Sequence, residues 1–288
     1  MSHPALAPVP FELVYDDGEP MENFKHVLQM TLLFDVIRQA MEERGRSDFF
    51  IGGNTFVYYS VEQARAVAED VKAGLPSSHP KATFRGPDVF FVDHVSGGLR
   101  EAWIAWEEGG RLPDLIVELL SPSTERIDRK TKMALYAQVF RTRNYFLFDP
   151  NNQTLEGYRL VGNAYEPIAP DRQGRLRSAV LGLDLGLWEG VVRTVESSEA
   201  EEGIWLRLFD PAGRLIPTLG EAAEARAAAE SARANTERAQ AAAEGIRADA
   251  EHARADAESA RADAERARAD AAEAELKRLR PLLDGLAE

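Results

Sequence analysis

The chain has 288 residues and no cysteine, which excludes disulfide bonds and thiolate metal sites. Its formal net charge of −14 disfavours a nucleic-acid partner, because affinity for phosphate comes mainly from Lys and Arg. No stretch approaches the ~20 apolar residues of a membrane span, and the opening residues MSHPALAPVP do not have the composition of a signal peptide, so we expect a cytoplasmic protein without membrane contact.

The first predicted elements are two helices with a pair of strands between them. From Phe11 to Arg44, apolar residues such as Val27, Met30, Leu33 and Ile37 recur at helical spacing, which predicts an amphipathic helix packed on a sheet. Residues 48–59 read DFFIGGNTFVYY, and the glycines predict a hairpin of two short strands. Residues 60–72 predict a second helix with the first serine as its cap.

The centre of the chain predicts a strand, a helix and another strand. Short apolar runs bounded by turn residues indicate buried strands at residues 89–92, 115–120 and 145–148. Residues 126–140, between the second and third runs, have helical spacing. This order is typical of a crossover within a mixed sheet. Beyond it, residues 151–195 predict a meander that extends the sheet, and residues 205–218 predict a last hairpin.

Two carboxylates lie in unusual places in this centre. Asp88 opens the first strand, and Glu118 lies inside the second, whose continuous apolar run predicts burial on both faces. A buried charge costs several kcal/mol unless it is compensated, and a cation would compensate it. The alternatives are that Asp88 caps a turn after Pro87 and that Glu118 faces solvent.

The helix that follows places one lysine toward these carboxylates. At about 100° per residue, Tyr136, Val139 and Phe140 share a face with Lys132, and Lys130 points nearly the opposite way. We therefore expect the Lys132 ammonium within ~4–6 Å of the Glu118 or Asp88 carboxylate, a range over which charges perturb each other, and Lys130 exposed. The alternative is that Lys132 extends its ammonium past the sheet edge into solvent.

These residues together resemble a known family. The quoted motifs are Pro87-Asp88, then Glu118-Leu119-Leu120-Ser121-Pro122-Ser123-Thr124, then Asp128, Lys132 and Tyr136, then Asp149-Pro150. The run resembles the Uma-two family of restriction endonucleases, within the PD-(D/E)XK nuclease superfamily. The resemblance implies an α/β, restriction-endonuclease-like fold in which helices flank a mixed sheet. The sequence departs from the superfamily's usual pattern at Leu120, where a lysine is normally found.

The resemblance also implies a function and a site. Asp88, Glu118 and the backbone carbonyl of Leu119 would hold Mg²⁺ or Mn²⁺, ions that favour oxygen ligands, and Lys132 would be the migrated catalytic lysine. The expected activity is metal-dependent endonuclease hydrolysis of nucleic-acid phosphodiester bonds, with DNA the expected partner. Asp114, in the second Pro-Asp pair, is expected to be a strand-start residue or to join an outer shell of the site.

The tail differs in composition from the rest. Residues 221–279 are rich in alanine, contain no proline and carry a repeated RADAExA unit, which predicts one long helix. Alanines between 250 and 274 alternate three and four apart, a coiled-coil seam by spacing, and Arg to Glu pairs four apart favour the helix. We expect a nuclease-like domain at 1–219 and a helical arm at 220–288. The arm would support a homodimer or bind a protein partner, or it would be a solvated single helix.

The acidic net charge of residues 1–219 favours an alternative to the endonuclease function. Residues 1–219 carry 23 basic and 32 acidic residues, so the body is acidic even without the arm. The alternative to an endonuclease is a catalytically silent module with a nuclease fold, which binds a protein partner through the arm.

Overall fold

The structure is a computed structural model that describes residues 24–74, 86–122, 124–192 and 200–284, with side chains described as far as residue 278. The chain divides into two compact units, Met1–Ala222 and Ala223–Glu288. The first unit is called the body below, and the second is called the arm.

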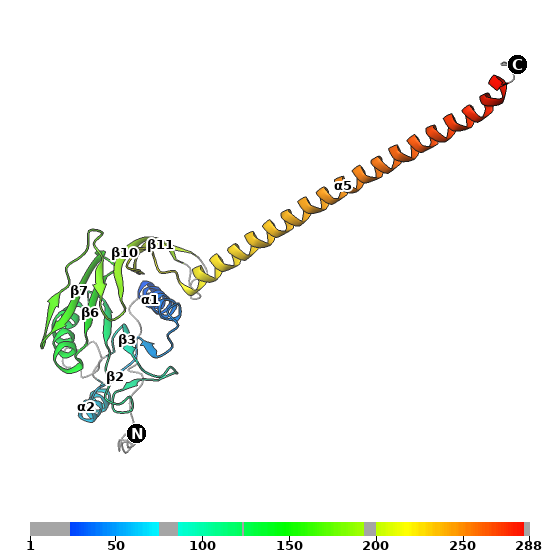
Figure 1. Ribbon diagram of the computed structural model, residues 1–288. Helices are drawn as coiled ribbons and strands as arrows, with labels where there is room; N and C mark the ends of the chain where they lie inside the picture. The colour runs from blue at the N-terminus through cyan, green and yellow to red at the C-terminus, as the bar shows by residue number, and fades with distance from the viewer. Residues whose placement is uncertain (1–23, 75–85, 123, 193–199, 285–288) are drawn as a thin grey trace. The chain divides into compact units, whose positions relative to one another are not determined.

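The body is built on a mixed six-stranded sheet in the order β1-β3-β5-β6-β7-β8 (Figure 1). The strands are β1 (Phe49–Gly52), β3 (Val89–Asp93), β5 (Leu115–Leu119), β6 (Asn144–Asp149), β7 (Thr154–Val161) and β8 (Ala164–Pro167). The central pair β5 and β6 is parallel, and the other neighbours are antiparallel. The predicted strands of the centre are thus confirmed as neighbours within one sheet.

The other described strands form two smaller sheets. A three-stranded antiparallel sheet has the order β11-β10-β9, from β9 (Leu176–Ser178), β10 (Leu183–Val192) and β11 (Glu201–Phe209). A short parallel pair joins β2 (Val57–Tyr58) to β4 (Trp103–Ile104). The predicted meander is therefore only partly right, because β7 and β8 extend the main sheet and β9 and β10 belong to another.

The predicted hairpin at 48–59 is wrong. β1 pairs with β3 and β2 pairs with β4, so the two strands do not pair with each other. The glycines between them serve close packing instead. A Cβ on Gly53 would lie 2.2 Å from the Asp88 carbonyl oxygen, and one on Gly52 would lie 2.5 Å from the Phe90 ring. Only glycine allows such an approach.

Helices cover both faces of the main sheet. The predicted first helix is α1 (Phe24–Glu42), and the second is α2 (Val61–Lys72), whose Ser60 hydroxyl accepts the Gln63 N–H as a cap. The crossover between β5 and β6 runs through α3 (Glu125–Ile127), η1 (Asp128–Lys132), α4 (Met133–Leu135) and η2 (Tyr136–Phe140). The two η segments are π-helical turns, wider than α-helical ones.

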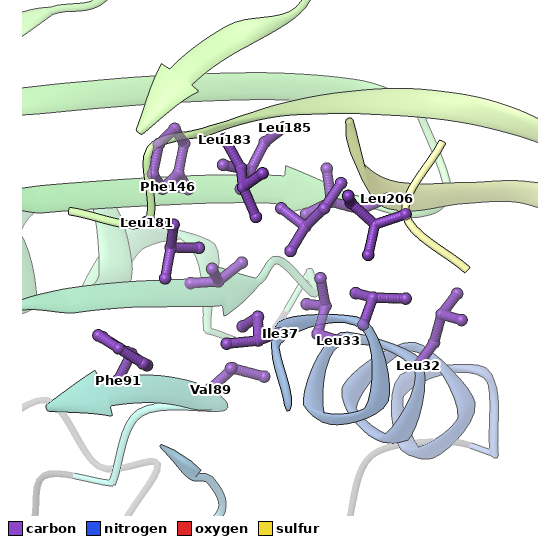
Figure 2. Close-up of a cluster of buried hydrophobic side chains, with 14 of the residues drawn as sticks. Leu32, Leu33, Ile37, Val89, Phe91, Phe146, Leu181, Leu183, Leu185 and Leu206 are labelled. Carbon is purple, nitrogen blue, oxygen red and sulfur yellow. The ribbon is translucent and has the colours of Figure 1, made fainter. Parts of the chain in front are cut away.

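The core is split between the two faces of the sheet because alternate strand residues point to opposite sides. On one face, α1 and the three-stranded sheet pack against the odd-numbered residues of β3 and β5 (Figure 2). Figure 2 shows Leu33 and Ile37 of α1 beside Val89. On the other face, Phe90, Ile116 and Leu120 pack with Tyr136 and Phe140 of the crossover. Even-numbered residues of β3 and β5 therefore face the crossover helix.

The arm is the continuation of α5 (Leu219–Asp284), the long helix predicted from composition. From residue 223 to 278 every side chain except that of Ala234 is exposed. The expected pairs from Arg247, Arg254 and Arg261 to the glutamates four residues on do not form within the described arm. An acidic residue placed before the basic one gives the better geometry, and these pairs have the reverse order. Among the described helices, none combines the length and apolar character needed to cross a bilayer.

Candidate active site

Asp88 and Glu118 meet where β3 and β5 run antiparallel. Val89 is opposite Val117, and continuing this register by one residue places Asp88 opposite Glu118. The Asp88 N–H donates to Glu118 Oε2 at 3.3 Å, and the Leu119 N–H donates to Asp88 Oδ2 at 2.6 Å. Two carboxylates directly across a strand pair repel each other, so this arrangement needs a positive charge nearby.

The segment between β1 and β2 supports the Asp88 backbone. The Asn54 N–H donates to the Pro87 carbonyl at 3.0 Å, and Gly53 packs against the Asp88 carbonyl as described above. The start of β3 is therefore held in place from a segment more than thirty residues earlier in the chain.

Glu118 is fully buried and is held from two sides by the crossover helix. The Tyr136 hydroxyl donates to its Oε1 at 2.9 Å, and the Lys132 Nζ lies 3.0 Å from its Oε2. The predicted burial of Glu118 and its proximity to Lys132 are confirmed, and the solvent-facing alternatives for both side chains are wrong. The assignment of Asp88 and Glu118 as metal ligands and of Lys132 as the catalytic lysine stays a prediction.

A third carboxylate completes the cluster. Asp128 is 1% exposed, and its Oδ1 lies 2.9 Å from Lys132 Nζ, while its backbone carbonyl accepts the Tyr145 hydroxyl at 3.0 Å. Asp128 is part of the family motif, but no role was predicted for it. Its four-residue spacing from Lys132 was the available signal, since such residues are neighbours on a helix.

Burial and like charge together set the protonation of the cluster. Burial raises the pKa of Glu118 well above its ordinary value, Lys132 lowers it in part, and the charges of Asp128 and Asp88 raise it further. Burial also raises the pKa of the half-buried Asp88, against the effect of Lys132. For Lys132, burial works to lower the pKa, but the Asp128 and Glu118 carboxylates outweigh it and the pKa is raised well above 10.5. Lys132 is therefore a permanent cation near neutral pH.

The winding of the crossover helix aligns these groups. Asp128, Lys132, Tyr136 and Phe140 are each four residues apart, and an α-helix would rotate each by about 40° from the one before. The two π-helical turns absorb this rotation, so all four face the sheet. The same winding explains one wrong expectation: Val139, predicted on the buried face, is 45% exposed. Lys130 is exposed, as expected.

Two further polar residues, Asp114 and His26, lie around the sheet. Asp114 precedes β5 at the end remote from Glu118, where its Oδ2 accepts the Asp93 N–H at 2.8 Å and its Oδ1 pairs with Arg143 at 3.1 Å. It is a strand-start residue, the first of the two expectations. His26 is buried in the first turn of α1, and a positive charge on its ring would act to lower the pKa of Asp88.

The donor chemistry fits a hard divalent cation. Asp88 and Glu118 offer carboxylate oxygens from neighbouring strands, and their mutual repulsion contributes to the raised pKa of Glu118. Among the described residues, no group of three or more His, Cys, Asp or Glu side chains is arranged to hold a metal ion. A cation at this position would therefore have two side-chain ligands and would need backbone and water oxygens for the rest.

Among the comparisons with known proteins, the match to a family model agrees with the sequence resemblance. A search of the curated proteins gives no match. Among solved structures, the chain is similar to a "putative nuclease belonging to DUF820" from Anabaena variabilis, with 17% identity and a TM-score of 0.37 over 58% of this chain and 81% of that one. The family model Uma2, described as "Putative restriction endonuclease", matches residues 9–196. This match covers β1 to β10, the crossover helix and the carboxylate cluster, and the chain belongs to the Uma2 family, the Uma-two family of the sequence resemblance.

Proposed function

We propose that the chain is a metal-dependent endonuclease that hydrolyses phosphodiester bonds in DNA. The observation that carries the proposal is the Lys132 ammonium held 3.0 Å from Glu118 Oε2, with Asp88 across the strand pair. A buried lysine and carboxylate cluster at the centre of a nuclease-family fold is a typical arrangement for chemistry, because perturbed pKa values gather at functional sites.

In this proposal, Asp88, Glu118 and the Leu119 backbone carbonyl would hold Mg²⁺ or Mn²⁺. The bound ion would supply Lewis-acid stabilisation and a water of lowered pKa. Tyr136 fixes one oxygen of Glu118 through its hydroxyl, and the Leu119 N–H fixes one oxygen of Asp88. Both carboxylates are thus oriented before any ligand arrives.

Lys132 has a separate task in the proposal. Its raised pKa keeps the ammonium charged, so it serves as a fixed electrostatic group and not as a general base. A positive charge placed where negative charge develops on a phosphate stabilises the transition state. Asp128 holds the ammonium in position from the other side.

The test is an assay of the purified chain on plasmid DNA, linear DNA and RNA, with Mg²⁺, with Mn²⁺ and with EDTA. We expect metal-dependent cleavage of DNA that Asp88→Asn, Glu118→Gln and Lys132→Met each reduce by at least about a hundredfold. Lys130→Met, two residues from Lys132 on the exposed side, is the matched control and should retain full activity. Cleavage that survives Lys132→Met would contradict the assigned role.

The second candidate is a silent nuclease-fold module that binds a protein partner. The acidic body favours it, because 32 acidic and 23 basic residues in 1–219 would repel DNA. Thermal melting separates the two candidates: a divalent metal that binds Asp88 and Glu118 should raise the melting temperature by mass action, and the double variant Asp88→Asn, Glu118→Gln should lose that rise. A protein with neither cleavage nor a metal response would be assigned to the second candidate.

A further inference from the structure

The described part of the arm has a continuous, exposed face of small residues. From Ala225 to Ala274 the positions alternate four and three residues apart, and all are alanine except Thr236 and Ile246. Ile246 is the single large apolar residue of this seam and is 71% exposed. Such a spacing over many heptads is the pattern by which two helices pack side by side.

Charges of opposite sign flank the seam on its two sides. One flank carries Asp249, Asp256 and Asp263, and the other carries Arg254, Arg261 and Arg268. The three arginines make no ion pair within the described arm, and Asp263 only approaches Arg266 at 3.9 Å. Residues beside a helix seam set the partner and the direction of pairing.

We propose that the seam pairs with the same seam of a second copy of this chain, in parallel and in register. In a parallel pair, a residue on one flank faces the residue five positions later on the partner's other flank. Asp249, Asp256 and Asp263 of one copy would then meet Arg254, Arg261 and Arg268 of the other, and the reverse pairs would form symmetrically.

The charges exclude the other direction. In an antiparallel pair each flank lies beside the same flank of the partner helix, so aspartate would meet aspartate and arginine would meet arginine. A heterologous partner would need the same alternation of charge. A second copy already has it. The inference is independent of the proposed nuclease activity, because it uses no residue of the body.

The contact should be weak and sensitive to salt. Alanine buries little apolar surface, which leaves Ile246 and the flanking charges to decide the association. We therefore expect a dimer that dissociates on dilution and at raised ionic strength.

The first test exchanges the charges. One full-length variant carries Arg254→Glu, Arg261→Glu and Arg268→Glu, and the other carries Asp249→Arg, Asp256→Arg and Asp263→Arg. By light scattering, the wild-type chain should dimerise, each variant alone should have a dissociation constant at least about tenfold higher, and their equimolar mixture should form a heterodimer. Circular dichroism checks that the variants keep their helix content. A wild-type chain that stays monomeric at every concentration, or variants that dimerise as well as the wild type, would overturn the proposal.

The second test determines whether the two helices are parallel or antiparallel. Because the sequence contains no cysteine, a single introduced cysteine is the only thiol in each variant. Ala239→Cys and Ala267→Cys are made separately in the seam, and Ala241→Cys and Ala269→Cys are matched controls away from it. Under oxidation with oxidised glutathione, both seam variants should form disulfide-linked dimers well ahead of their controls. Linkage at only one seam position would indicate an antiparallel pair and contradict the proposal, as would equal linkage at seam and control positions.

Discussion

At the scale of single residues, Lys132 is the charge on which the cluster depends. Its ammonium lies about equally close to Glu118 and Asp128, two carboxylates that are each at most 1% exposed. Removing one partner from a buried ionic group leaves the remaining charges uncompensated, which is among the most destabilising changes a core can undergo.

We expect Lys132→Met to lower the free energy of unfolding by about 3–5 kcal/mol at neutral pH. The exposed Lys130→Met should change it by no more than about 0.5 kcal/mol. Urea unfolding of the two variants beside the wild type measures both values. Equal effects at the two positions would show that Lys132 does not compensate the buried carboxylates.

The sequence predicted part of this cluster, and the physical reasons for success and failure differ. A continuous apolar run around Glu118 implies burial, and a buried carboxylate implies a nearby cation, so Lys132 could be predicted from neighbouring residues alone. Helical spacing also predicted that Lys132 and Tyr136 share a face, but it did not predict that Asp128 joins them, because its alignment depends on π-helical turns that α-helical spacing does not indicate. Val139 was placed on the wrong face for the same reason.

At the scale of elements, strands and helices were predictable where their signals were local. β3, β5 and β6 have short, mainly apolar runs, and α2 has its Ser60 cap. The pairing of β1 was not predictable, because its partner β3 lies about forty residues away and Gly52-Gly53 has the composition of a tight turn. These glycines are needed where two backbones approach each other, a requirement that appears only in the folded chain.

The start of α5 is an element whose stability should depend on pH. The Thr218 hydroxyl accepts the Glu221 N–H at 3.1 Å, the Glu221 carboxylate accepts the Thr218 N–H at 2.8 Å, and Arg207 Nη2 lies 2.8 Å from the same carboxylate. Burial works to raise the pKa of Glu221, but the hydrogen bonds from Arg207 and Thr218 and the charge of Arg207 together outweigh it, and the pKa lies below the ordinary 4.5.

A lowered pKa means that the folded state favours the ionised carboxylate. The stabilisation from Glu221 is present above its unfolded pKa of about 4.3 and is lost as the pH falls through the folded pKa. We expect Glu221→Gln to be less stable than the wild type at pH 7, with the difference shrinking as the pH is lowered below about 4.3. Urea unfolding at several pH values measures it, and the exposed Glu224→Gln serves as control. A difference that stayed constant over this range would argue against the ion pair.

At the scale of the whole molecule, the boundary between body and arm decides where the chain can be shortened. Composition changes near Leu219, which places the predicted domain end at 219, but Arg207 in β11 is fully buried and its carboxylate partner is Glu221. A chain that ends at 219 would lack Glu221. The buried Arg207 guanidinium would then lose its carboxylate partner and keep its hydrogen bond to the Ile216 carbonyl.

We expect a chain ending after Ala229 to melt cooperatively and close to the full-length protein, because it keeps the whole compact unit that ends at Ala222, and the described side chains from 223 to 278 are exposed apart from Ala234. A chain ending after Leu219 should be less stable by about 2–5 kcal/mol, the usual cost of truncating one partner of a buried charge pair. Calorimetry or urea unfolding of the two shortened chains decides this. Equal stability would place the end of the body at 219, as composition alone suggests.

The reciprocal bonds between Thr218 and Glu221 also determine how the long helix melts. Closing the first turn is the unfavourable step in forming any helix, and each later turn adds at little cost. In α5 that first turn is already closed and is tied to β11 through Arg207. The folded body therefore provides the nucleus from which the helix extends. On heating, the helix of a single copy should unfold first at the end remote from Glu221. Amide exchange should be slowest beside Glu221 and progressively faster along the arm.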